Sequence, residues 1–575
     1  MIILGINAYH ADSSAAIFVN GKLIAAIEEE RFQRVKHWAG FPAKAIEFCL
    51  NEVGIQIEQV DHIAIGRDPK AKFLKKLLFM AGNPAGSFKV VKDRFQNARN
   101  VTSLETEFEK HFNVLANTIK PKIYQVEHHR SHLASAFFAS PFKRAALLSI
   151  DGSGDFTTTM TGIGDDNNMA VLDSVDFPHS VGLFYTSFTQ FLGFPNYGDE
   201  YKVMGLAPYG EPKYIDKLSK VIHLQNDGLF RLDLSYFVSA TEGMVTYGEA
   251  DVPQVHQLFN GKVESEFGAA RKSKQPITQY HKDMAASIQQ ITENVIFHIL
   301  HHLHKKTNID TVCIAGGVAQ NSVANGKIIQ NTPFKNVYIP SAGHDAGISM
   351  GAGLYVQHQV KQYPRQCAIL SAYTGSSYSN EEIENLLVAR KISYRRLEDE
   401  QLYNVVSERL INAGVVGWFN GKAEFGPRAL GARSILADPR RNDAKDLLND
   451  KIKRRESFRP FAPSILKEHV KDFFEIDDAV PFMEKVFRIK SEKQASVPAV
   501  THVDGTGRLQ SVDRDVSPKF YRLIEAFFNK TGIPILLNTS FNENEPIVNS
   551  PEQALNCFLR TQMDMLVLEN IVVER

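Results

Sequence analysis

Two histidines at helical spacing are the residues of this chain whose types and positions most clearly permit metal chemistry. His128 and His132 follow an apolar run at residues 123–126 and precede Pro141, so we expect a strand and then a helix that ends before the proline. Residues four apart share one face of a helix, and both imidazoles could therefore bind one metal ion. The pair by itself fits a polar, half-exposed helix about equally well.

Two carboxylates strengthen the metal interpretation. Asp151 follows an apolar run at 147–150 and opens an Asp-Gly-Ser-Gly-Asp segment that ends at Asp155, and Asp345 follows a second apolar run at 337–339. A strand that ends in such a segment is typical of phosphate loops that also carry a metal-binding carboxylate. Two imidazoles and two carboxylates suit iron(II), manganese or zinc better than calcium, and the donor types do not rank these three metals.

A group of basic residues forms the second candidate site. Arg428, Lys453 and Arg459 lie near glycine or proline and are flanked by apolar residues. Ordering cations in such places costs free energy unless an anion meets them, although a basic, solvent-exposed surface is the alternative. Basic and aromatic residues do not alternate here, which argues against nucleic acid. We expect a phosphate-rich small molecule.

The composition excludes several classes of protein. With 575 residues, 43% of them hydrophobic, the chain is expected to be globular with more than one domain. Its 65 basic and 65 acidic side chains create no overall field for nucleic acid or an anionic membrane. The four scattered cysteines indicate neither a zinc ribbon nor a disulfide framework. Without a signal-peptide pattern or a membrane-spanning apolar stretch, we expect a cytoplasmic enzyme.

Strands and helices must position these residues. We expect strands at 2–6, 15–19 and 23–27, with a hairpin turn at Asn20-Gly21 and a polar tip at 5–14 whose backbone N–H groups face a phosphate. A long amphipathic helix at 284–303 precedes a strand at 311–314 and the paired Gly316 and Gly317, an order that suits nucleotide approach to bare backbone.

That long helix also carries four histidines, His298, His301, His302 and His304. We interpret them as a solvent-exposed face, because no carboxylate-bearing loop follows them.

The hydrophobic pattern loosens between residues 357 and 378, and we place a domain boundary near 365. Beyond it we expect helices at 380–389 and 402–413, a strand at 415–419, and a buried strand that starts at 534 and ends on polar residues. No internal repeat is evident.

Nine short motifs occur in a fixed order along nearly the whole chain. They occupy residues 9–16, 28–32, 128–132, 151–155, 201–207, 315–321, 426–431, 458–461 and 537–542. In this order they resemble the O-carbamoyltransferases of the nodulation, cephamycin and tobramycin pathways. Each motif is modestly specific, but the ordered set is very specific.

The resemblance implies an α/β fold with two domains. Residues 1–364 would form an actin-like (ASKHA, Kae1-like) carbamoyl-transfer domain, similar to the enzyme that finishes threonylcarbamoyl-adenosine on tRNA. Residues 365–575 would form an α+β, YrdC-like domain, similar to the carbamoyl-adenylate-forming partner of that pathway. The C-terminal domain would join carbamoyl phosphate to ATP, and the N-terminal domain would transfer the carbamoyl group to a hydroxyl near a divalent metal, usually iron, Fe(II).

The resemblance also implies roles for residues of the N-terminal domain. The metal ligands would be His128, His132, Asp151 and Asp345. His10 would be the transfer-site histidine, whose neutral imidazole takes the acceptor proton, with Asp12 as the alternative base. Lys36 and His37 would line the acceptor pocket, and Lys36 is counted among the catalytic residues. ATP or its phosphates would meet Asp151, Gly152, Ser153, Gly154, Asp155, Gly316, Gly317 and Asn321.

In the C-terminal domain the resemblance concerns the reactants of the first step. Carbamoyl phosphate or the adenylate would contact Arg428, Lys453, Arg459, Arg508, Asn538 and Ser540. The expected function is ATP-dependent O-carbamoylation of a small natural product, such as an antibiotic, an alkaloid toxin or a sugar. Residues 73–117 and 225–275 carry few motifs and are expected to select the acceptor. We expect a homodimer and neither nucleic acid nor a membrane as partner.

Four other functions fit the sequence less well. Threonylcarbamoyl transfer to tRNA requires a basic surface, which the zero net charge disfavours. A hydrogenase-maturation carbamoyltransferase would need Cys-x-x-Cys motifs and the reverse domain order. A metalloprotease would need the general-base Glu of His-Glu-x-x-His, which is missing between His128 and His132. A non-enzymatic, actin-like ATPase would leave the C-terminal arginines unexplained.

Overall fold

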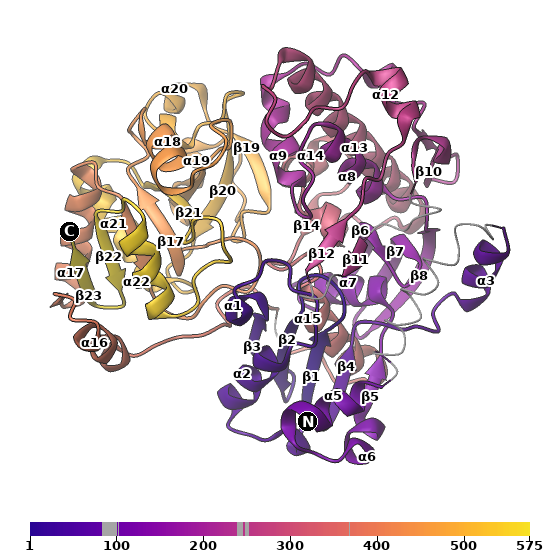
Figure 1. Ribbon diagram of the computed structural model, residues 1–575, viewed down its shortest axis with the longest axis horizontal. Helices are drawn as coiled ribbons and strands as arrows, with labels where there is room; N and C mark the ends of the chain where they lie inside the picture. The colour runs from indigo at the N-terminus through magenta and orange to yellow at the C-terminus, as the bar shows by residue number, and fades with distance from the viewer. Residues whose placement is uncertain (83–100, 102, 239–244, 248–251, 367) are drawn as a thin grey trace. The chain divides into compact units, whose positions relative to one another are not determined.

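The computed structural model describes every residue except 83–100, 102, 239–244, 248–251 and 367. The described residues have a mixed α/β fold and divide into two units, Met1–Ile369 and Leu370–Arg575, each with its own sheets (Figure 1). Parts of the two segments expected to select the acceptor lie outside the described residues. No helix among the described residues is long and apolar enough to cross a membrane.

The first sheet of the first unit contains the three predicted N-terminal strands. Its members are β1 (Ile2–Asn7), β2 (Ser14–Val19), β3 (Lys22–Glu28), β4 (His62–Ile65) and β5 (Ile123–Gln125), in the order β3-β2-β1-β4-β5. β1, β2 and β3 are antiparallel neighbours, whereas β4 is parallel to β1 and β5 to β4. The hairpin turn at Asn20-Gly21 is confirmed, and both residues have the positive φ that this dipeptide tolerates.

The second sheet repeats this arrangement. It contains β6 (Arg144–Gly154), β7 (Thr157–Asp165), β8 (Asn168–Asp176), β13 (Thr311–Ala315) and β14 (Asn336–Tyr338), in the order β14-β13-β6-β7-β8. Three strands again form an antiparallel meander, β13 pairs in parallel with the first of them, β6, and β14 pairs in parallel with β13. The repeat exists in the strand order although no repeat is evident in the sequence.

Two helices that pack against each other lie between the two sheets. α15 (Gly347–Leu354) packs on β1, β2 and β4 of the first sheet, and α7 (His128–Phe137) packs on β6, β7 and β13 of the second (Figure 1). The two helices also pack against each other. Their contact is very close, because a Cβ added at Gly351 would lie 1.9 Å from the carbonyl oxygen of Ser131. The helix predicted around His128 and His132 is therefore confirmed, and it lies at the centre of the unit.

The other elements of the first unit surround this centre. The predicted long helix is α13 (Gln279–Thr307). The remaining helices are α1 (Glu30–Gln33), α2 (Ala43–Val53), α3 (Phe73–Gly82), α5 (Leu104–Phe112), α6 (Ala116–Ile119), α8 (Val181–Phe191), α9 (Glu200–Leu206), α10 (Ile215–Leu218), α12 (Gly261–Phe267) and α14 (Ser322–Asn331). Two small hairpins are formed by β9 (Ile222–Leu224) with β10 (Phe230–Leu232), and by β11 (Val245–Tyr247) with β12 (Pro253–Val255).

The second unit is built on a mixed nine-stranded sheet with the order β15-β23-β22-β16-β17-β21-β18-β20-β19. The strands are β15 (Arg395–Arg396), β16 (Val416–Phe419), β17 (Arg433–Ala437), β18 (Ala462–Leu466), β19 (Lys485–Arg488), β20 (Thr506–Val512), β21 (Ile535–Ser540), β22 (Met565–Leu568) and β23 (Ile571–Glu574). The pairs β16–β22 and β18–β20 are parallel. The helices predicted at 380–389 and 402–413 are confirmed as α16 (Asn380–Ala389) and α17 (Asp399–Ile411).

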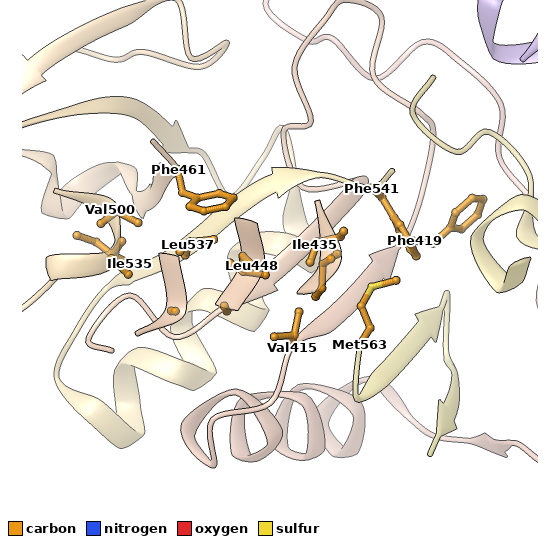
Figure 2. Close-up of a cluster of buried hydrophobic side chains, with 14 of the residues drawn as sticks. Val415, Phe419, Ile435, Leu448, Phe461, Val500, Ile535, Leu537, Phe541 and Met563 are labelled. Carbon is orange, nitrogen blue, oxygen red and sulfur yellow. The ribbon is translucent and has the colours of Figure 1, made fainter. Parts of the chain in front are cut away.

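Helices cover both faces of this sheet. Trp418, Leu436 and Leu536 pack with α17 and α21 (Pro518–Thr531), while their chain neighbours Phe419, Ile435 and Leu537 belong to the cluster on the opposite face (Figure 2). Consecutive strand residues point to opposite faces, so these strands are apolar on both sides. The opposite cluster includes residues of α16 and α22 (Pro551–Arg560), and short helices α18 (Ala444–Leu447), α19 (Val470–Phe473) and α20 (Ser491–Gln494) complete the unit.

The contact between α7 and α15 leads to a stability prediction. Helix propensity alone would make Gly351→Ala stabilising by about 1 kcal/mol. The added methyl group would instead meet the backbone of Ser131, and we expect a net destabilisation of about 1–3 kcal/mol, seen as a lower thermal midpoint. Gly261→Ala is the matched control, because nothing lies within 4 Å of its added Cβ. Equal midpoints for both variants would contradict the close contact.

Candidate functional site

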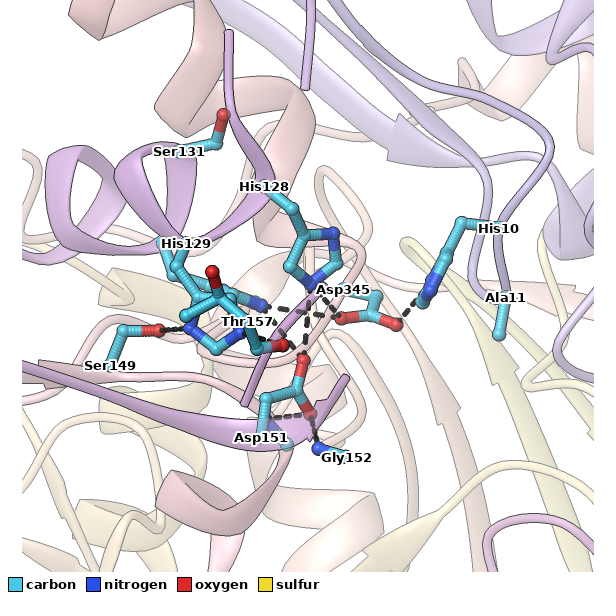
Figure 3. A network of polar contacts seen from close by, with 12 residues as sticks. His10, Ala11, His128, His129, Ser131, Ser149, Asp151, Gly152, Thr157 and Asp345 are labelled. Carbon is cyan, nitrogen blue, oxygen red and sulfur yellow. Dashed lines mark hydrogen bonds and ion pairs between the residues drawn. The ribbon is translucent and has the colours of Figure 1, made fainter. Parts of the chain in front are cut away.

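The four predicted metal ligands meet at one place in the first unit (Figure 3). Nε2 of His128 and Nε2 of His132 each lie 3.2 Å from Oδ2 of Asp151. The same two nitrogen atoms lie 3.6 and 3.3 Å from Oδ1 of Asp345. All four residues are buried, and one donor atom of each lies within 4.8 Å of the others, so the group could hold a metal ion.

Backbone amides orient the Asp151 carboxylate. Its Oδ1 accepts hydrogen bonds from the N–H groups of Gly152 at 2.7 Å and Gly317 at 3.0 Å, which leaves Oδ2 facing the imidazoles. The predicted loop after Asp151 is instead part of a hairpin, because β6 continues to Gly154 with an irregular register after Ile150. Gly317, the second glycine of the Gly316-Gly317 pair, thus contacts one of the four metal-ligand residues, here called the metal group. Contact of the glycine pair with ATP stays a prediction.

The rest of the Asp-Gly-Ser-Gly-Asp segment positions His128. A Cβ at Gly154 would lie 2.1 Å from the His128 ring, so only glycine leaves space for the imidazole there. Oδ2 of Asp155 accepts hydrogen bonds from the N–H groups of His128 at 3.0 Å and Asp68 at 2.7 Å. Ser153 is half-buried. These contacts shape the metal group, and phosphate binding by the segment stays a prediction.

The charges of this group balance when a divalent cation is bound. Burial alone would lower the pKa of His132, but hydrogen bonds and charges from Asp151 and Asp345 raise it to about 9. Despite burial, contacts with the histidines hold the pKa of Asp151 well below its ordinary value. A bound metal ion would displace the proton of His132, and two buried carboxylates with two neutral imidazoles then carry two negative charges, so the residues fit a divalent metal.

His129 lies beside the ligands but is held by the protein. Its Nδ1 lies 2.8 Å from Oγ of Ser149 and its Nε2 lies 3.0 Å from the carbonyl oxygen of Thr157 (Figure 3). Burial and the neighbouring histidines hold the pKa of His129 well below its ordinary value. A neutral ring can therefore accept from Ser149 and donate to Thr157, and so link α7 to β6 and β7. The sequence alone does not indicate this role of His129.

His10 reaches the metal group from the loop between β1 and β2. Its Nδ1 lies 2.7 Å from Oδ2 of Asp345, the carboxylate whose other oxygen faces His128 and His132. Burial opposes protonation of His10, but the Asp345 charge raises its pKa overall. Nδ1 thus lies beside a carboxylate at ion-pair distance, and Nε2 is left for a reacting group.

The other residues predicted for the transfer site lie in a neighbouring cluster. Oδ1 of Asp12 lies 2.8 Å from Nδ1 of His37, and the backbone N–H of His37 donates to Oε2 of Glu30 at 3.0 Å. Burial lowers and Asp12 raises the pKa of His37, with a net rise to about 9. Lys36 is exposed. Asp12 is therefore engaged by an imidazole, whereas His10 is the histidine next to the metal group.

Asn321, predicted to meet ATP, caps a helix. Its Oδ1 accepts from the N–H of Ala324 at 3.1 Å at the start of α14, and its amide pairs twice with Gln289 at 3.0 Å. Gly316 has φ 104° and donates its N–H to the carbonyl oxygen of Gly343. These contacts join β13 to α14, and a contact of Asn321 with ATP stays a prediction.

In the second unit, guanidinium groups converge on Arg508. Burial and the charges of Arg428, Arg455 and Arg459 hold the pKa of Arg508 well below its ordinary value. Nε of Arg508 has no hydrogen-bond partner in the part of the chain that the structure describes. Nη1 of Arg459 lies 3.5 Å from Oε2 of Glu456. Such a concentration of cations favours an anion. Arg455 was missed, although it lies in the same basic run as Lys453.

Asn538 and Lys453 both have hydrogen-bond partners on the strands of this sheet. Nζ of Lys453 donates to the carbonyl oxygens of Ser540 at 2.5 Å and Asn542 at 2.8 Å, so it holds the end of β21. Nδ2 of Asn538 donates to Ser464 Oγ at 3.0 Å. Oδ1 of Asn538 is buried and has no hydrogen-bond partner among the described residues. The predicted residues therefore present an unpaired donor on Arg508 and an unpaired acceptor on Asn538.

A buried carboxylate shapes the loop that carries Arg428. Oε1 of Glu424 accepts hydrogen bonds from the N–H groups of Leu430 at 2.7 Å, Ala432 at 2.7 Å and Arg433 at 3.2 Å. One carboxylate oxygen with three backbone donors fixes the loop strongly. Glu424 precedes the Gly-Pro-Arg motif by two residues, and the sequence alone does not indicate its role.

Known proteins resemble the chain along nearly its whole length. Residues 2–354 match the carbamoyltransferase N-terminus family and residues 407–575 match the carbamoyltransferase C-terminus family. An uncharacterized protein of Synechocystis sp., sll1178, is 41% identical, with 100% of this chain and 96% of that protein covered. Nodulation protein NolNO of Sinorhizobium fredii is 36% identical, with 99% and 80% covered. Nodulation protein U of Rhizobium fredii is 27% identical, with 94% and 89% covered.

The metal group gives a direct prediction. The purified protein should bind about one divalent ion per chain, and His128→Ala/His132→Ala should bind none, because two of four ligands are lost. His298→Ala/His302→Ala is the matched control, since these histidines have the same spacing on α13 but belong to no metal-ligand group among the described residues. Elemental analysis checks both. Stoichiometric metal in His128→Ala/His132→Ala would exclude the site.

Proposed function

The chain belongs to the carbamoyltransferase family of enzymes, and we propose that it is an ATP-dependent O-carbamoyltransferase. In this proposal it uses carbamoyl phosphate, through carbamoyl-adenylate, to carbamoylate a hydroxyl of a small natural product. An antibiotic, an alkaloid or a sugar derivative is the class of acceptor we propose.

One observation in the second unit carries the proposal. Arg508 offers an unpaired donor and Asn538 an unpaired acceptor, and the described residues do not satisfy either atom. Arg428, Arg455 and Arg459 add positive charge around Arg508. Carbamoyl phosphate has matching chemistry, because its phosphate oxygens accept hydrogen bonds and its amide N–H group donates them.

The first half-reaction forms the carbamoyl-adenylate. Carbamoyl phosphate, ATP and one water yield carbamoyl-adenylate, phosphate and pyrophosphate. Water releases the phosphate and leaves carbamate, and a carbamate oxygen bonds to the α-phosphorus of ATP as the bond to pyrophosphate breaks. Arginines that meet the phosphates offset the charge that develops as these bonds change. The carbamoyl group thereby gains a good leaving group, AMP.

The second half-reaction belongs to the metal group of the first unit. The acceptor oxygen bonds to the carbamoyl carbon, the bond to AMP breaks, and the hydroxyl proton leaves. A bound divalent metal, proposed to be iron(II), would polarise the carbamoyl carbonyl. His10 is suited to hold the proton, because Asp345 orients its Nδ1 and leaves Nε2 for the acceptor.

The fold supports the same assignment. The strand order of the first sheet recurs in the second, which supports an actin-like (ASKHA, Kae1-like) domain with its site between two similar halves. We propose the YrdC-like class for the mixed sheet of the second unit. A metalloprotease is disfavoured, because His129 occupies the place of the general-base Glu and is held by Ser149 and Thr157. We also propose that the protein forms a homodimer and binds no nucleic acid.

The role of the arginines is tested by Arg459→Ala. Loss of a guanidinium that meets a phosphate should reduce pyrophosphate release from ATP, in the presence of carbamoyl phosphate, by about a hundredfold or more. Metal content should match that of the parent protein, because the metal group lies in the other unit. Arg488→Ala, an exposed arginine on β19, is the control and should keep the parent rate. A parent-like rate in Arg459→Ala would disprove the assignment.

The role of His10 is tested by His10→Asn, because asparagine keeps a hydrogen bond but cannot take a proton at neutral pH. We expect carbamoyl transfer to the acceptor to fall by about a hundredfold or more. Pyrophosphate release and metal content should stay at parent values. His62→Asn, a half-buried histidine on β4, controls for the loss of an imidazole. Near-parent transfer in His10→Asn would make His10 a positioning residue.

A further inference from the structure

A backbone carbonyl in the second unit determines how one buried amide is turned. The carbonyl oxygen of Leu430 lies 2.7 Å from Nε2 of Gln510. A carbonyl oxygen can accept but cannot donate, so Gln510 must direct its amino group to Leu430. Its Oε1 then lies on the other side, 2.5 Å from Oγ of Ser464 and 3.2 Å from Nδ2 of Asn538.

The orientation passes from Gln510 to Asn538. Because Oε1 of Gln510 can only accept, Ser464 donates its hydroxyl proton to it and Asn538 turns its amino group toward both residues. The carbonyl oxygen of Ala429 is a further acceptor for Nδ2, at 3.2 Å. Oδ1 of Asn538 must therefore point away from these acceptors. The residue is 1% exposed, and a buried acceptor without a donor costs free energy.

The surroundings of this oxygen indicate which ligand supplies the donor. Arg508 precedes Gln510 by two residues on β20 and shares its face of the sheet. Arg428 precedes Ala429, and Lys453 holds Ser540 at the end of the strand that carries Asn538. Cationic residues thus stand next in the chain or on the strand to groups that hold Asn538, whose Oδ1 needs an N–H or O–H donor. A ligand that combines a phosphate with an amide N–H matches both requirements.

We propose that Gln510, assisted by Ser464, is a specificity-determining positioning residue that turns Asn538 so that its Oδ1 accepts a hydrogen bond from the carbamoyl N–H group. This inference rests on the proposed function and extends it to substrate choice. Acetyl phosphate is the informative comparison, because it has a methyl group where carbamoyl phosphate has an amino group. A site built around an unpaired acceptor rejects a ligand that lacks the donor.

The experiment compares equilibrium binding of carbamoyl phosphate and acetyl phosphate to the full chain, in the cold and without ATP. The parent protein should bind carbamoyl phosphate about tenfold or more tightly than acetyl phosphate. Gln510→Leu removes the acceptor that holds the Asn538 amino group, and the ratio of the two affinities should fall about threefold or more. Ser464→Ala is a smaller change and should lower the ratio in the same direction.

Two further variants separate orientation from general damage to the site. Gln510→Glu keeps acceptor oxygens for Ser464 and Asn538 but loses the donor to Leu430, so both affinities should change together and the ratio should persist. Tyr373→Phe removes the other hydrogen bond to the Leu430 carbonyl, which measures 2.7 Å, without touching Asn538, and should also keep the ratio.

Parent-like ratios in both Gln510→Leu and Ser464→Ala would overturn the inference, and so would equal binding of the two phosphates by the parent protein. A lowered ratio in Tyr373→Phe would overturn it as well, because the effect would then come from the loop. If Gln510→Leu does not fold, Ser464→Ala decides the question. Failure of the proposed function is recognised separately, as a parent protein that releases no pyrophosphate from ATP with carbamoyl phosphate.

Discussion

The balance of buried charge is the constraint on which both candidate sites depend. In the first unit, Asp151 and Asp345 lie away from solvent with two imidazoles. In the second unit the sign is reversed, and no carboxylate pairs with Arg508 in the described part of the chain while other guanidiniums lower its pKa. A charge taken out of water is stable only when an opposite charge or hydrogen bonds compensate it. The first site therefore favours a cation and the second an anion, in agreement with the proposed metal-assisted transfer of a carbamoyl group.

Backbone groups give both sites their geometry. Two N–H groups hold one oxygen of Asp151, and a third and fourth hold Asp155 beside the start of α7. In the second unit, three N–H groups meet Glu424, and the carbonyl oxygen of Leu430 turns Gln510. A backbone group cannot rotate independently of its strand or loop, so each such bond fixes a side chain of a candidate site relative to the fold. Glycine is needed where this backbone comes closest, as at Gly154 against the His128 ring.

Much of the fold could be predicted from local patterns. The strands β1, β2 and β3, the Asn-Gly turn between the last two, and the helices α7, α13, α16 and α17 follow from hydrophobic periods and turn residues, which act over a few neighbouring residues. The continuation of β6 through the Asp-Gly-Ser-Gly segment was not predicted, because pairing with β7 outweighs the preference of glycine for loops. The repeated strand order of the two sheets was also invisible, since it depends on which strands pair.

The sequence by itself determined which residue types are available for chemistry: a histidine pair at helical spacing, acidic residues after apolar runs, and arginines beside glycine and proline. Spacing could place His128 and His132 on one helix face, because four residues span one turn. The family resemblance named Asp151 and Asp345 as further ligands, and the tertiary structure brings both to this pair. Only the tertiary structure decided that Asp12 contacts His37 and that Asn321 caps a helix. It alone revealed Arg455 beside Arg508 and the role of Glu424, whose backbone partners lie only 6 to 9 residues later in the chain. It also revealed Gln510, whose partners Leu430 and Ser464 are remote in the chain. Local pattern fixes the direction of a side chain on its own element, whereas its partner depends on how elements pack and pair, which is a property of the whole fold.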